Sequence, residues 1–577
     1  LHAHSKDNSG WAQLSKDGLV PPNSSSWFKL ILSSDSTSVT WWDDAHIEGN
    51  FEVERNVQVY VNQLGFELSG QKFFTASSNF ISDSALFEII DQNNETVYSS
   101  SLSFRDRIKG AFGHDWGSYY WRGDFTQVKK PGHYRIKIVL DGLEDISWPF
   151  EIANNLYWEK TVRPAYRFFY YQRCGMEIPG FHEACHLDDA ADEKHEQFFD
   201  LAGGWHDAGD YNKYYNAPYV LGLANTYHNQ QELILSQEIN KDGSNEILEE
   251  ILWGADFSRR MIAPDGSARG ELTSGWGYFG VPELETDNIP KTGDERPLIE
   301  SVSGKNSSSH TAAMAKVARI TKNNSEYLEA AKRGLAWAIE QKLQGPLQLS
   351  AAVDLYAITG EEEFSKLSKK LFDVCGLDDV AITIEYDKVF HTDHSEQIKN
   401  RLTKEADKML EWSENPFGFY TYGPKENSNF FGTPADHPKF AIGTNHYVLN
   451  AVEKMGLAYL YNPNPLYLEF IYNQLNWILG NDPYGISLME GIGSSFAPTY
   501  HHRYVLAGVP RGAVPGGIVN GIVWKDIGVD TPYFDMSGVD IPYYASNEFW
   551  LPHNTNYIKA ISVLQKVLQQ SNEKLKN

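Results

Sequence analysis

The chain has 577 residues, of which 41% are hydrophobic and 22% are charged, so it is long enough for two or more domains with ample cores. No run approaches the roughly 18 apolar residues that cross a bilayer, and we expect no membrane partner. The net charge is −26, which argues against nucleic acid as a partner because phosphate binding needs a basic surface. An acidic surface suits a neutral or cationic substrate, although solubility explains the charge equally well.

The cysteine content is low: Cys174, Cys185 and Cys375 are the only three. An odd, small number argues against a disulfide framework and favours a reducing compartment, so we expect a cytoplasmic location. The chain begins at Leu1 without a methionine, and a secreted or periplasmic location stays open if a leader was removed. The sequence does not predict an oligomeric state.

The first 154 residues, taken in order, predict a polar segment followed by a β-sandwich. Residues 1–55 are polar, carry the WWDD cluster at 41–44 and stay unassigned, with strands of the first domain as one interpretation. From residue 56 the hydrophobic period is two, which predicts strands at 57–61, 85–90 and 134–140, separated by the turn sequences DQNN and KKPGH. Short strands with turn signals over about 100 residues are typical of a β-sandwich, here at 56–154.

After Tyr157 the period changes to 3.6 and predicts an all-α domain at 155–577. A helix after Asn464 has that residue as its N-cap, Pro465 in its first turn and Gly480 as its stop. About a dozen such segments indicate paired helices in an (α/α)6 toroid. Long loops near 262–307, 414–438 and 483–546 are expected to form a cleft at one rim, because long loops in a compact domain are usually functional. One predicted helix face carries Ile247, Ile251, Leu252 and Ala255, and another carries Leu328, Ala331, Leu335 and Ile339.

Two carboxylate signals suggest acid–base chemistry. The segment GGWHDAGDYNKYYN (203–216) places Asp207 and Asp210 three residues apart, where both can reach one point; a loop with capping aspartates is the structural alternative. Far downstream, Glu548 lies among aromatic residues, which favours a raised pKa, although the same residue fits a helix N-terminus. A raised-pKa carboxylic acid and an ionised carboxylate together are the machinery of glycoside hydrolysis.

Four segments in the same order carry a resemblance to a known family. LAGGWHDAGDYNKY resembles the D-A-G-D signature of glycoside hydrolase family 9. The stretches at 276–297, 478–503 and 546–555 are similar to later segments of that family, and VNQLGF…GDF…PGHYRI resembles the immunoglobulin-like domain that precedes many members. The resemblance covers roughly residues 57 to 565.

The resemblance implies a role for each matching residue. Asp210 matches the catalytic base, Asp207 the partner that holds the water, and Glu548 the acid. His501 and Arg503 match residues that bind the sugar, and Tyr544 is a further sugar-contact candidate beside the acid. The family inverts the anomeric carbon, which requires room for a water between base and sugar.

A separate group of residues suggests a metal. Cys174, Cys185, His186 and His206 supply two thiolates and two imidazoles, which suits tetrahedral zinc; two buried cysteines and two ordinary histidines are the alternative. With four protein ligands the metal would be structural and would fix the loop that carries Asp207. Some relatives with this N-terminal domain carry a similar zinc. Some family members also bind calcium, for which no convincing loop is seen here, and Cys375 is interpreted as a core thiol.

The sequence departs from the family where substrate is recognised. Glu490 and Trp550 stand where small residues are usual, and Ser495, Tyr500 and Tyr543 also differ. An extra carboxylate favours a cationic sugar, and a bulky Trp550 could close a cleft into a pocket. These changes resemble a subgroup of marine bacterial members that remove glucosamine units from the ends of short chitosan oligosaccharides. The resemblance implies an exo-acting enzyme on such glucosamine (chitosan-type) oligosaccharides, with WWDD at 41–44 as a second cation-binding candidate. The alternatives are drift within an endo-β-1,4-glucanase and a carbohydrate-binding protein without catalysis, which would be expected to have lost Asp210 or Glu548.

Overall fold

The computed structural model describes residues 2–6, 12–15, 54–109, 115–214, 216–235, 245–273, 277–299, 302–322, 324–421, 443–524 and 531–576. The predicted cation-binding stretch at 41–44 lies outside these residues. Near the N-terminus, β1 (His2–Lys6) and β2 (Ala12–Ser15) form an antiparallel pair.

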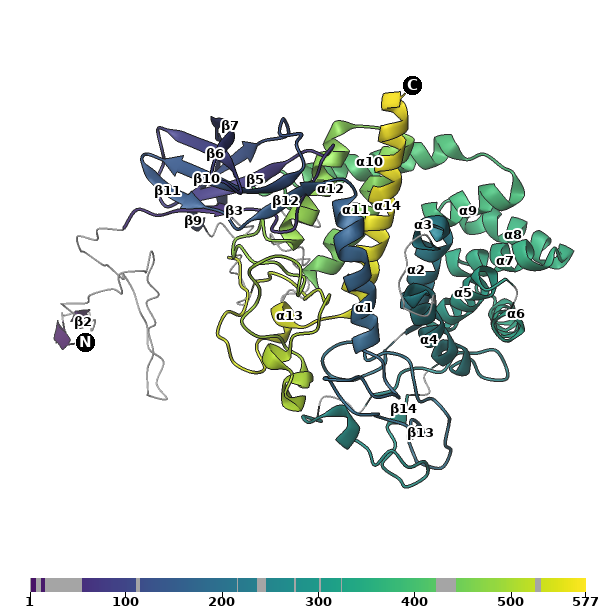
Figure 1. Ribbon diagram of the computed structural model, residues 1–577. Coiled ribbons are helices and arrows are strands. Elements are labelled where there is room, and N and C mark those ends of the chain that lie inside the picture. The colour runs from purple at the N-terminus through teal and green to yellow at the C-terminus, as the bar shows by residue number, and fades with distance from the viewer. Residues whose placement is uncertain are drawn as a thin grey trace.

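The first domain is a sandwich of two sheets (Figure 1), as predicted. One sheet has the order β4-β12-β10-β6-β7 with β11 paired to β10, and the other has the order β3-β5-β9-β8. Alternate residues of β10 face the core, where Ile136, Ile138 and Leu140 are fully buried. The predicted strands at 57–61, 85–90 and 134–140 correspond to β3, β6 and β10. The strands are β3 (Val57–Tyr60), β4 (Gly65–Glu67), β5 (Phe73–Ser78), β6 (Ala85–Asp91), β7 (Thr96–Ser101), β8 (Ser103–Lys109), β9 (Asp115–Asp124), β10 (Gly132–Leu140), β11 (Leu143–Ile146) and β12 (Phe150–Ala153).

The rest of the described chain is helical, with long loops gathered below the sandwich in Figure 1. Twelve of the described α-helices have nine or more residues, as expected for an (α/α)6 toroid. Neighbouring helices pack in pairs, such as α5 on α6 and α11 on α14. The helices are α1 (Arg163–Tyr171), α2 (Asn216–Asn229), α3 (Gln231–Leu235), α4 (Glu246–Arg260), α5 (Gly304–Ile320), α6 (Ser325–Glu340), α7 (Pro346–Thr359), α8 (Glu362–Cys375), α9 (Val380–Phe390), α10 (Ser395–Glu411), α11 (Thr444–Tyr461), α12 (Pro465–Ile478), α13 (Tyr544–Asn547) and α14 (Leu551–Lys576).

Helix α12 confirms its predicted boundary signals. The Asn464 side chain accepts a hydrogen bond from the Leu466 amide at 3.0 Å, Pro465 opens the helix, and Gly480 follows it with a φ of +120°. On the predicted face of α6, Leu328, Ala331 and Leu335 are buried, whereas Ile339 is 48% exposed. The buried stripe advances by 3.6 residues per turn and reaches Ala338 instead.

The sandwich packs against the end of α12 and the loop that follows it. Asn62 donates to the Asn476 side chain at 3.0 Å, and the Gln63 amide donates to the Leu479 carbonyl at 2.8 Å. The Gln63 side-chain oxygen accepts from the amides of Ser494 and Ser495. The sandwich therefore holds the N-terminal part of the long 483–546 loop. None of the described helices combines the length and the apolar character that a membrane span requires.

Candidate active site

The loop that carries the two aspartates runs from Gly203 to the start of α2. Gly203 and Gly204 have φ of +99° and +72°, a region that L side chains rarely adopt. At Gly209, a Cβ atom would lie 2.4 Å from the His501 carbonyl oxygen. Glycine at that position therefore lets the 203–214 loop touch the segment around residue 501.

Asp207 is buried, and each of its two carboxylate oxygens accepts a hydrogen bond. The Tyr219 hydroxyl of α2 donates to Oδ1 at 2.7 Å, and the Trp550 indole Nε1 donates to Oδ2 at 2.6 Å. Burial raises the pKa of Asp207 to about 7, against the opposing effect of these two donors. Tyr219 and Trp550 thus fix the orientation of a carboxyl group that titrates near neutrality.

Asp210 is also buried, 4% exposed, and its carboxylate is held from within its own loop. The Asn212 amide donates to Oδ1 at 3.2 Å, and the Asn212 side chain donates to Oδ2 at 2.6 Å. Asn212 is held in turn by Thr273, whose hydroxyl donates to it at 2.7 Å. Asn212 thus fixes the orientation of both carboxylate oxygens of Asp210.

The segment that carries Glu548 lies directly against this loop. Ala208 and Trp550 form an antiparallel bridge, and the Leu551 amide donates to the Asp207 carbonyl at 3.0 Å. Glu548 ends α13 and is partly buried; its carboxylate accepts from the Gly209 amide. Burial raises the pKa of Glu548 well above its usual value, and the nearby charges of Asp210 and Asp207 raise it further.

Three of the predicted sugar-binding residues surround this group. The Arg503 amide donates to the Gly209 carbonyl at 3.1 Å, and the Arg503 guanidinium donates to the Asp210 carbonyl at 2.9 Å and lies 4.5 Å from the centre of the Phe279 ring. His501 Nδ1 lies 2.7 Å from the Pro542 carbonyl oxygen, and burial lowers its pKa, so the ring is neutral near pH 7. Tyr544 opens α13, with its ring centre 6.0 Å from that of His501.

Glu490 is engaged by protein partners. Its carboxylate forms an ion pair with Arg511 at 2.6 Å and accepts a hydrogen bond from the Tyr500 hydroxyl. The residue is 9% exposed. Its negative charge is therefore already compensated by a guanidinium, which removes the physical reason for assigning it to a sugar ammonium group.

The predicted metal ligands come together on the other side of the same loop. One donor atom from each of Cys174, Cys185, His186 and His206 lies within 4.8 Å of all the others, and all four residues are buried. Cys174 Sγ lies 3.5 Å from His186 Nδ1, and Cys185 Sγ lies 3.7 Å from His206 Nε2. Tetrahedral zinc with bonds of about 2.0–2.3 Å separates its ligand atoms by roughly 3.3–3.8 Å, so the group fits that ion. The remaining nitrogen of His186 lies 2.9 Å from Glu285, as is common for a metal-ligating histidine.

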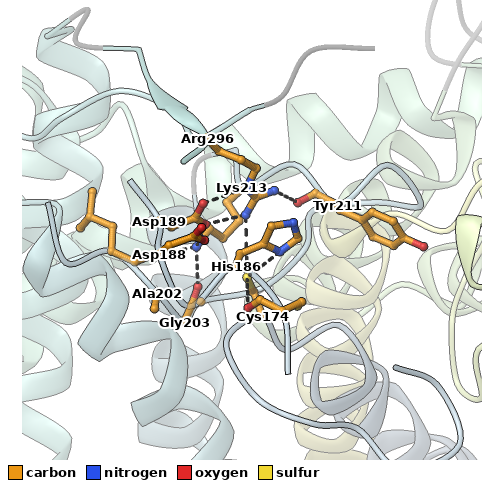
Figure 2. Close-up of polar contacts among 12 residues, drawn as sticks. Cys174, His186, Asp188, Asp189, Ala202, Gly203, Tyr211, Lys213 and Arg296 are labelled. Atoms are coloured by element: carbon orange, nitrogen blue, oxygen red, sulfur yellow. Dashed lines mark hydrogen bonds and ion pairs between the residues drawn. The ribbon is translucent and has the colours of Figure 1, made fainter. Parts of the chain in front are cut away.

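A buried ion-pair network supports the loop between the metal group and the aspartates (Figure 2). Asp189 pairs with Arg296 at 2.6 Å and with Lys213 at 2.8 Å, and all three side chains are at most 1% exposed. Lys213 also donates to the carbonyls of Leu201 and Gly203. Burial opposes ionisation of Asp189, but the two cations outweigh it and keep its pKa below the usual range. The network ties both ends of the loop that carries Asp207 and Asp210 to one buried carboxylate.

Sequence reasoning missed several of these contacts. Tyr219 and Asn212 were not identified as partners of the aspartates, and Trp550 was interpreted only as a cleft-closing side chain. The Tyr219 contact joins α2 to a loop twelve residues earlier, and the Trp550 contact spans 343 residues. Asn212, two residues after Asp210, is the one partner that spacing could have indicated.

Comparisons with known proteins agree with this geometry. Residues 158–560 match the family model described as glycosyl hydrolase family 9, and residues 54–142 match the cellulase N-terminal Ig-like domain. A xyloglucan-specific endo-β-1,4-glucanase of Bacteroides ovatus is 23% identical over 88% of this chain and 94% of its own. Endoglucanase D of Acetivibrio thermocellus is 24% identical over 80% of this chain and 76% of its own. A cellodextrinase of Butyrivibrio fibrisolvens is 27% identical over 61% and 62%.

Solved structures share the fold. A metagenome-derived endoglucanase of glycoside hydrolase family 9 superposes with a TM-score of 0.69 at 21% identity, covering 88% of this chain and 98% of that one. The N-terminal domain is thus Ig-like and the helical domain has the toroid of the family, as expected from the sequence.

Proposed function

Because residues 158–560 match its model, the chain belongs to glycosyl hydrolase family 9, and we propose that it cleaves internal β-1,4 linkages of a glucan with inversion at the anomeric carbon. The observation that carries the proposal is the contrast between two carboxyl groups on adjoining segments. Asp210 is held by donors to both oxygens, while the pKa of Glu548 is raised by burial and by two neighbouring aspartates.

The contrast assigns the roles. Glu548 keeps its proton at neutral pH and protonates the departing glycosidic oxygen. Asp210 removes a proton from the attacking water, and Asn212 holds both of its carboxylate oxygens in place. Asp207 orients that water while its own geometry is fixed by donors from other elements. After one turnover the proton balance is restored by solvent: Glu548 has lost a proton and Asp210 has gained one.

Charged and aromatic groups around the acid are proposed to bind the sugar next to the cut. Arg503 is 3% exposed, and its Nε has no hydrogen-bond partner among the described residues, so a sugar hydroxyl could take that donor. Neutral His501 offers a second hydrogen-bonding group. Tyr544 supplies an aromatic ring beside Glu548.

Internal attack on a glucan is favoured over the predicted end-wise attack on glucosamine oligomers. The xyloglucan-specific enzyme and endoglucanase D are both named as endo-acting glucanases. At the residue level, Glu490 is paired with Arg511, and Trp550 Nε1 is directed to Asp207. Both residues that motivated the glucosamine prediction therefore have another structural role. Because one relative is a cellodextrinase, short glucans belong among the substrates to be compared.

We further propose that Cys174, Cys185, His186 and His206 hold a structural zinc. Their donor set and spacing fit tetrahedral coordination, and four protein ligands leave no position for a water. The zinc would cross-link the loop at His206, one residue before Asp207. In this way the metal would contribute to positioning, with no part in bond cleavage.

Product analysis tests the function. Time courses should compare cellopentaose, a chitosan pentamer, xyloglucan and carboxymethyl-cellulose at equal enzyme concentration. We expect dimers and trimers to appear together from cellopentaose, and a clear fall in carboxymethyl-cellulose viscosity. Monomer appearing first, with higher kcat/KM on the chitosan pentamer, would instead support the exo-acting glucosaminidase.

A further inference from the structure

The short helix that precedes the proposed acid cannot hold its own position. α13 comprises Tyr544–Asn547, and Glu548 follows it in an extended backbone conformation, with a φ of −84° and a ψ of 133°. A single helical turn fixes many dihedral angles for few internal hydrogen bonds and is not stable by itself. The place of the Glu548 carboxyl group therefore depends on what holds α13.

Asn520 contacts both ends of this short helix. Its backbone amide donates to the Glu548 carbonyl at 2.8 Å, and its side-chain Nδ2 donates to the Tyr544 carbonyl at 3.0 Å. The next amide along the chain, that of Gly521, donates to the Ser546 carbonyl at 3.0 Å. One side chain and two backbone amides thus hold the segment that ends in Glu548.

Asn520 is itself held by two long helices, α11 and α14, which pack against each other (Figure 1). It is 1% exposed, and its Oδ1 lies 2.7 Å from His553 Nε2 in the first turn of α14. Its carbonyl accepts from the Asn445 amide at 3.2 Å and from the Thr444 hydroxyl at 3.1 Å, at the start of α11. Both backbone groups and both ends of its side-chain amide therefore have partners.

The hydrogen bond between His553 and Asn520 has a defined direction. Because Nδ2 of Asn520 donates to the Tyr544 carbonyl, the amide oxygen faces His553 and can only accept. Burial lowers the pKa of His553 well below its usual value, and the neighbouring His446 acts in the same direction, so the ring is neutral near pH 7. Its single proton lies on Nε2, since the buried Nδ1 has no partner among the described residues.

We propose that His553 and Asn520 are positioning residues that hold the Glu548 carboxyl group where it can protonate the departing glycosidic oxygen. The inference rests on the acid role of Glu548 in the proposed function. Both act through the backbone of α13, because their printed contacts are with the Tyr544 and Glu548 carbonyls. Proton transfer needs a separation of about 2.6–3.2 Å between heavy atoms, and a displacement of about 1 Å can lower a rate about 10²-fold.

The dependence of the rate on the leaving group separates this role from a second route. The His553 ring centre also lies 5.5 Å from that of Trp550, whose indole donates to Asp207. An effect through Asp207 would slow the attack of water for every substrate. An effect through Glu548 should appear only where the leaving oxygen needs a proton.

Hydrolysis of two substrates by the full chain tests the proposal. His553→Phe keeps a ring of similar shape and removes the donor to Asn520. For cellopentaose, whose leaving group needs protonation, kcat should fall about 10–10²-fold with little change in KM. For 2,4-dinitrophenyl β-cellobioside, whose phenolate leaves without a proton, kcat should stay within about twofold. His553→Gln, which keeps a terminal N–H group, should recover most of the cellopentaose activity. Asn520→Ala leaves α14 unchanged and should show the same dependence on the leaving group.

The matched control is His310→Phe in α5. His310 is 2% exposed, and its Nδ1 lies 3.0 Å from the Ser258 carbonyl, so the same change removes one buried histidine contact elsewhere. This variant should keep the wild-type ratio of the two activities, even with a lower Tm. Equal losses on both substrates in His553→Phe, or no loss on cellopentaose, would overturn the proposal.

Amide hydrogen exchange supplies a measurement that needs no substrate. In His553→Phe the amides of residues 545–549 should exchange faster than in the wild type, whereas His553→Gln and His310→Phe should leave them unchanged. Unchanged exchange at 545–549 in His553→Phe would overturn the proposal. A wild type that cleaves no glucan would contradict the proposed function, and the exchange result would still decide whether His553 holds this segment.

Discussion

The two sides of the loop from Gly203 to Asn216 differ in how their polar groups are satisfied. On one side His206 joins three other buried donors that converge on a single point, supported by Glu285 and by the Asp189 network. On the other side Asp207 and Asp210 face Glu548, and two of these three carboxyl groups have pKa values raised by burial. The donor types on the first side match a metal, whereas the second side gathers three carboxyl groups. In the proposed roles, adjacent residues of one loop serve stability and reactivity separately.

The largest expected effect lies on the reactive side. Asp210→Asn and Glu548→Gln should each lower kcat by at least about 10²-fold, because general base or general acid catalysis is lost. Asp207→Asn should also be severe, since the water loses an orienting acceptor. The control is Asp200→Asn, an exposed aspartate at the edge of the same region. Near-normal turnover by either Asp210→Asn or Glu548→Gln, with an unchanged circular dichroism spectrum, would refute the assignment.

A substitution on the opposite side of the loop should lower the stability of the fold. Cys185→Ser should reduce the zinc content from about one per chain and lower the Tm, because metal binding stabilises the folded state. Cys375→Ser is the matched control, because Cys375 is a buried thiol, as predicted, and donates to the Leu371 carbonyl of its own helix. Elemental analysis that finds no zinc in unchelated wild-type protein would contradict the metal assignment.

The pKa of Glu548 makes the stability of the wild type depend on pH. Between the unfolded pKa of 4.5 and the raised folded value, the folded state holds a proton that the unfolded chain has lost. The free energy of unfolding therefore falls as pH rises through this window, by up to about 1.4 kcal/mol per pH unit for this one group. Glu548→Gln lacks this loss, so its stability relative to the wild type should improve from pH 5 to pH 8. Denaturant melts at both pH values measure the difference, with Glu95→Gln as the exposed control; equal slopes would contradict the pKa shift.

The smallest effect concerns the hydrogen bond from Trp550. Burial raises the pKa of Asp207 to about 7, and the hydrogen bond from the Trp550 indole opposes this rise. In Trp550→Phe the donor is lost, so the acidic limb of the kcat/KM–pH profile should move upward by about 0.4–1.1 pH units, the equivalent of one hydrogen bond. Trp524→Phe is the control, because the Trp524 Nε1 has no partner among the described residues. An unshifted acidic limb in Trp550→Phe would show that the indole does not tune the carboxyl group.

Local signals were sufficient for much of the fold and part of the site. The cap at Asn464 and the alternation along β10 are determined by neighbouring residues, so sequence reasoning found them. The sequence also predicted that Cys174, Cys185, His186 and His206 come together, because two thiolates and two imidazoles are donors that suit zinc. By contrast, the partners of Glu490 and Trp550 lie 21 and 343 residues away, and no periodicity encodes such distances. The charge of Glu490 was visible in the sequence, but its compensation by Arg511 was not.

The anomeric configuration of the first product tests the central claim most directly. Proton NMR during early hydrolysis of cellopentaose observes the new reducing end before mutarotation. If Asp210 activates water while Glu548 protonates the leaving oxygen, the β-linkage should yield the α-anomer first. Initial accumulation of the β-anomer would mean that a carboxylate attacks the sugar directly, and it would contradict the roles assigned to Asp210 and Glu548.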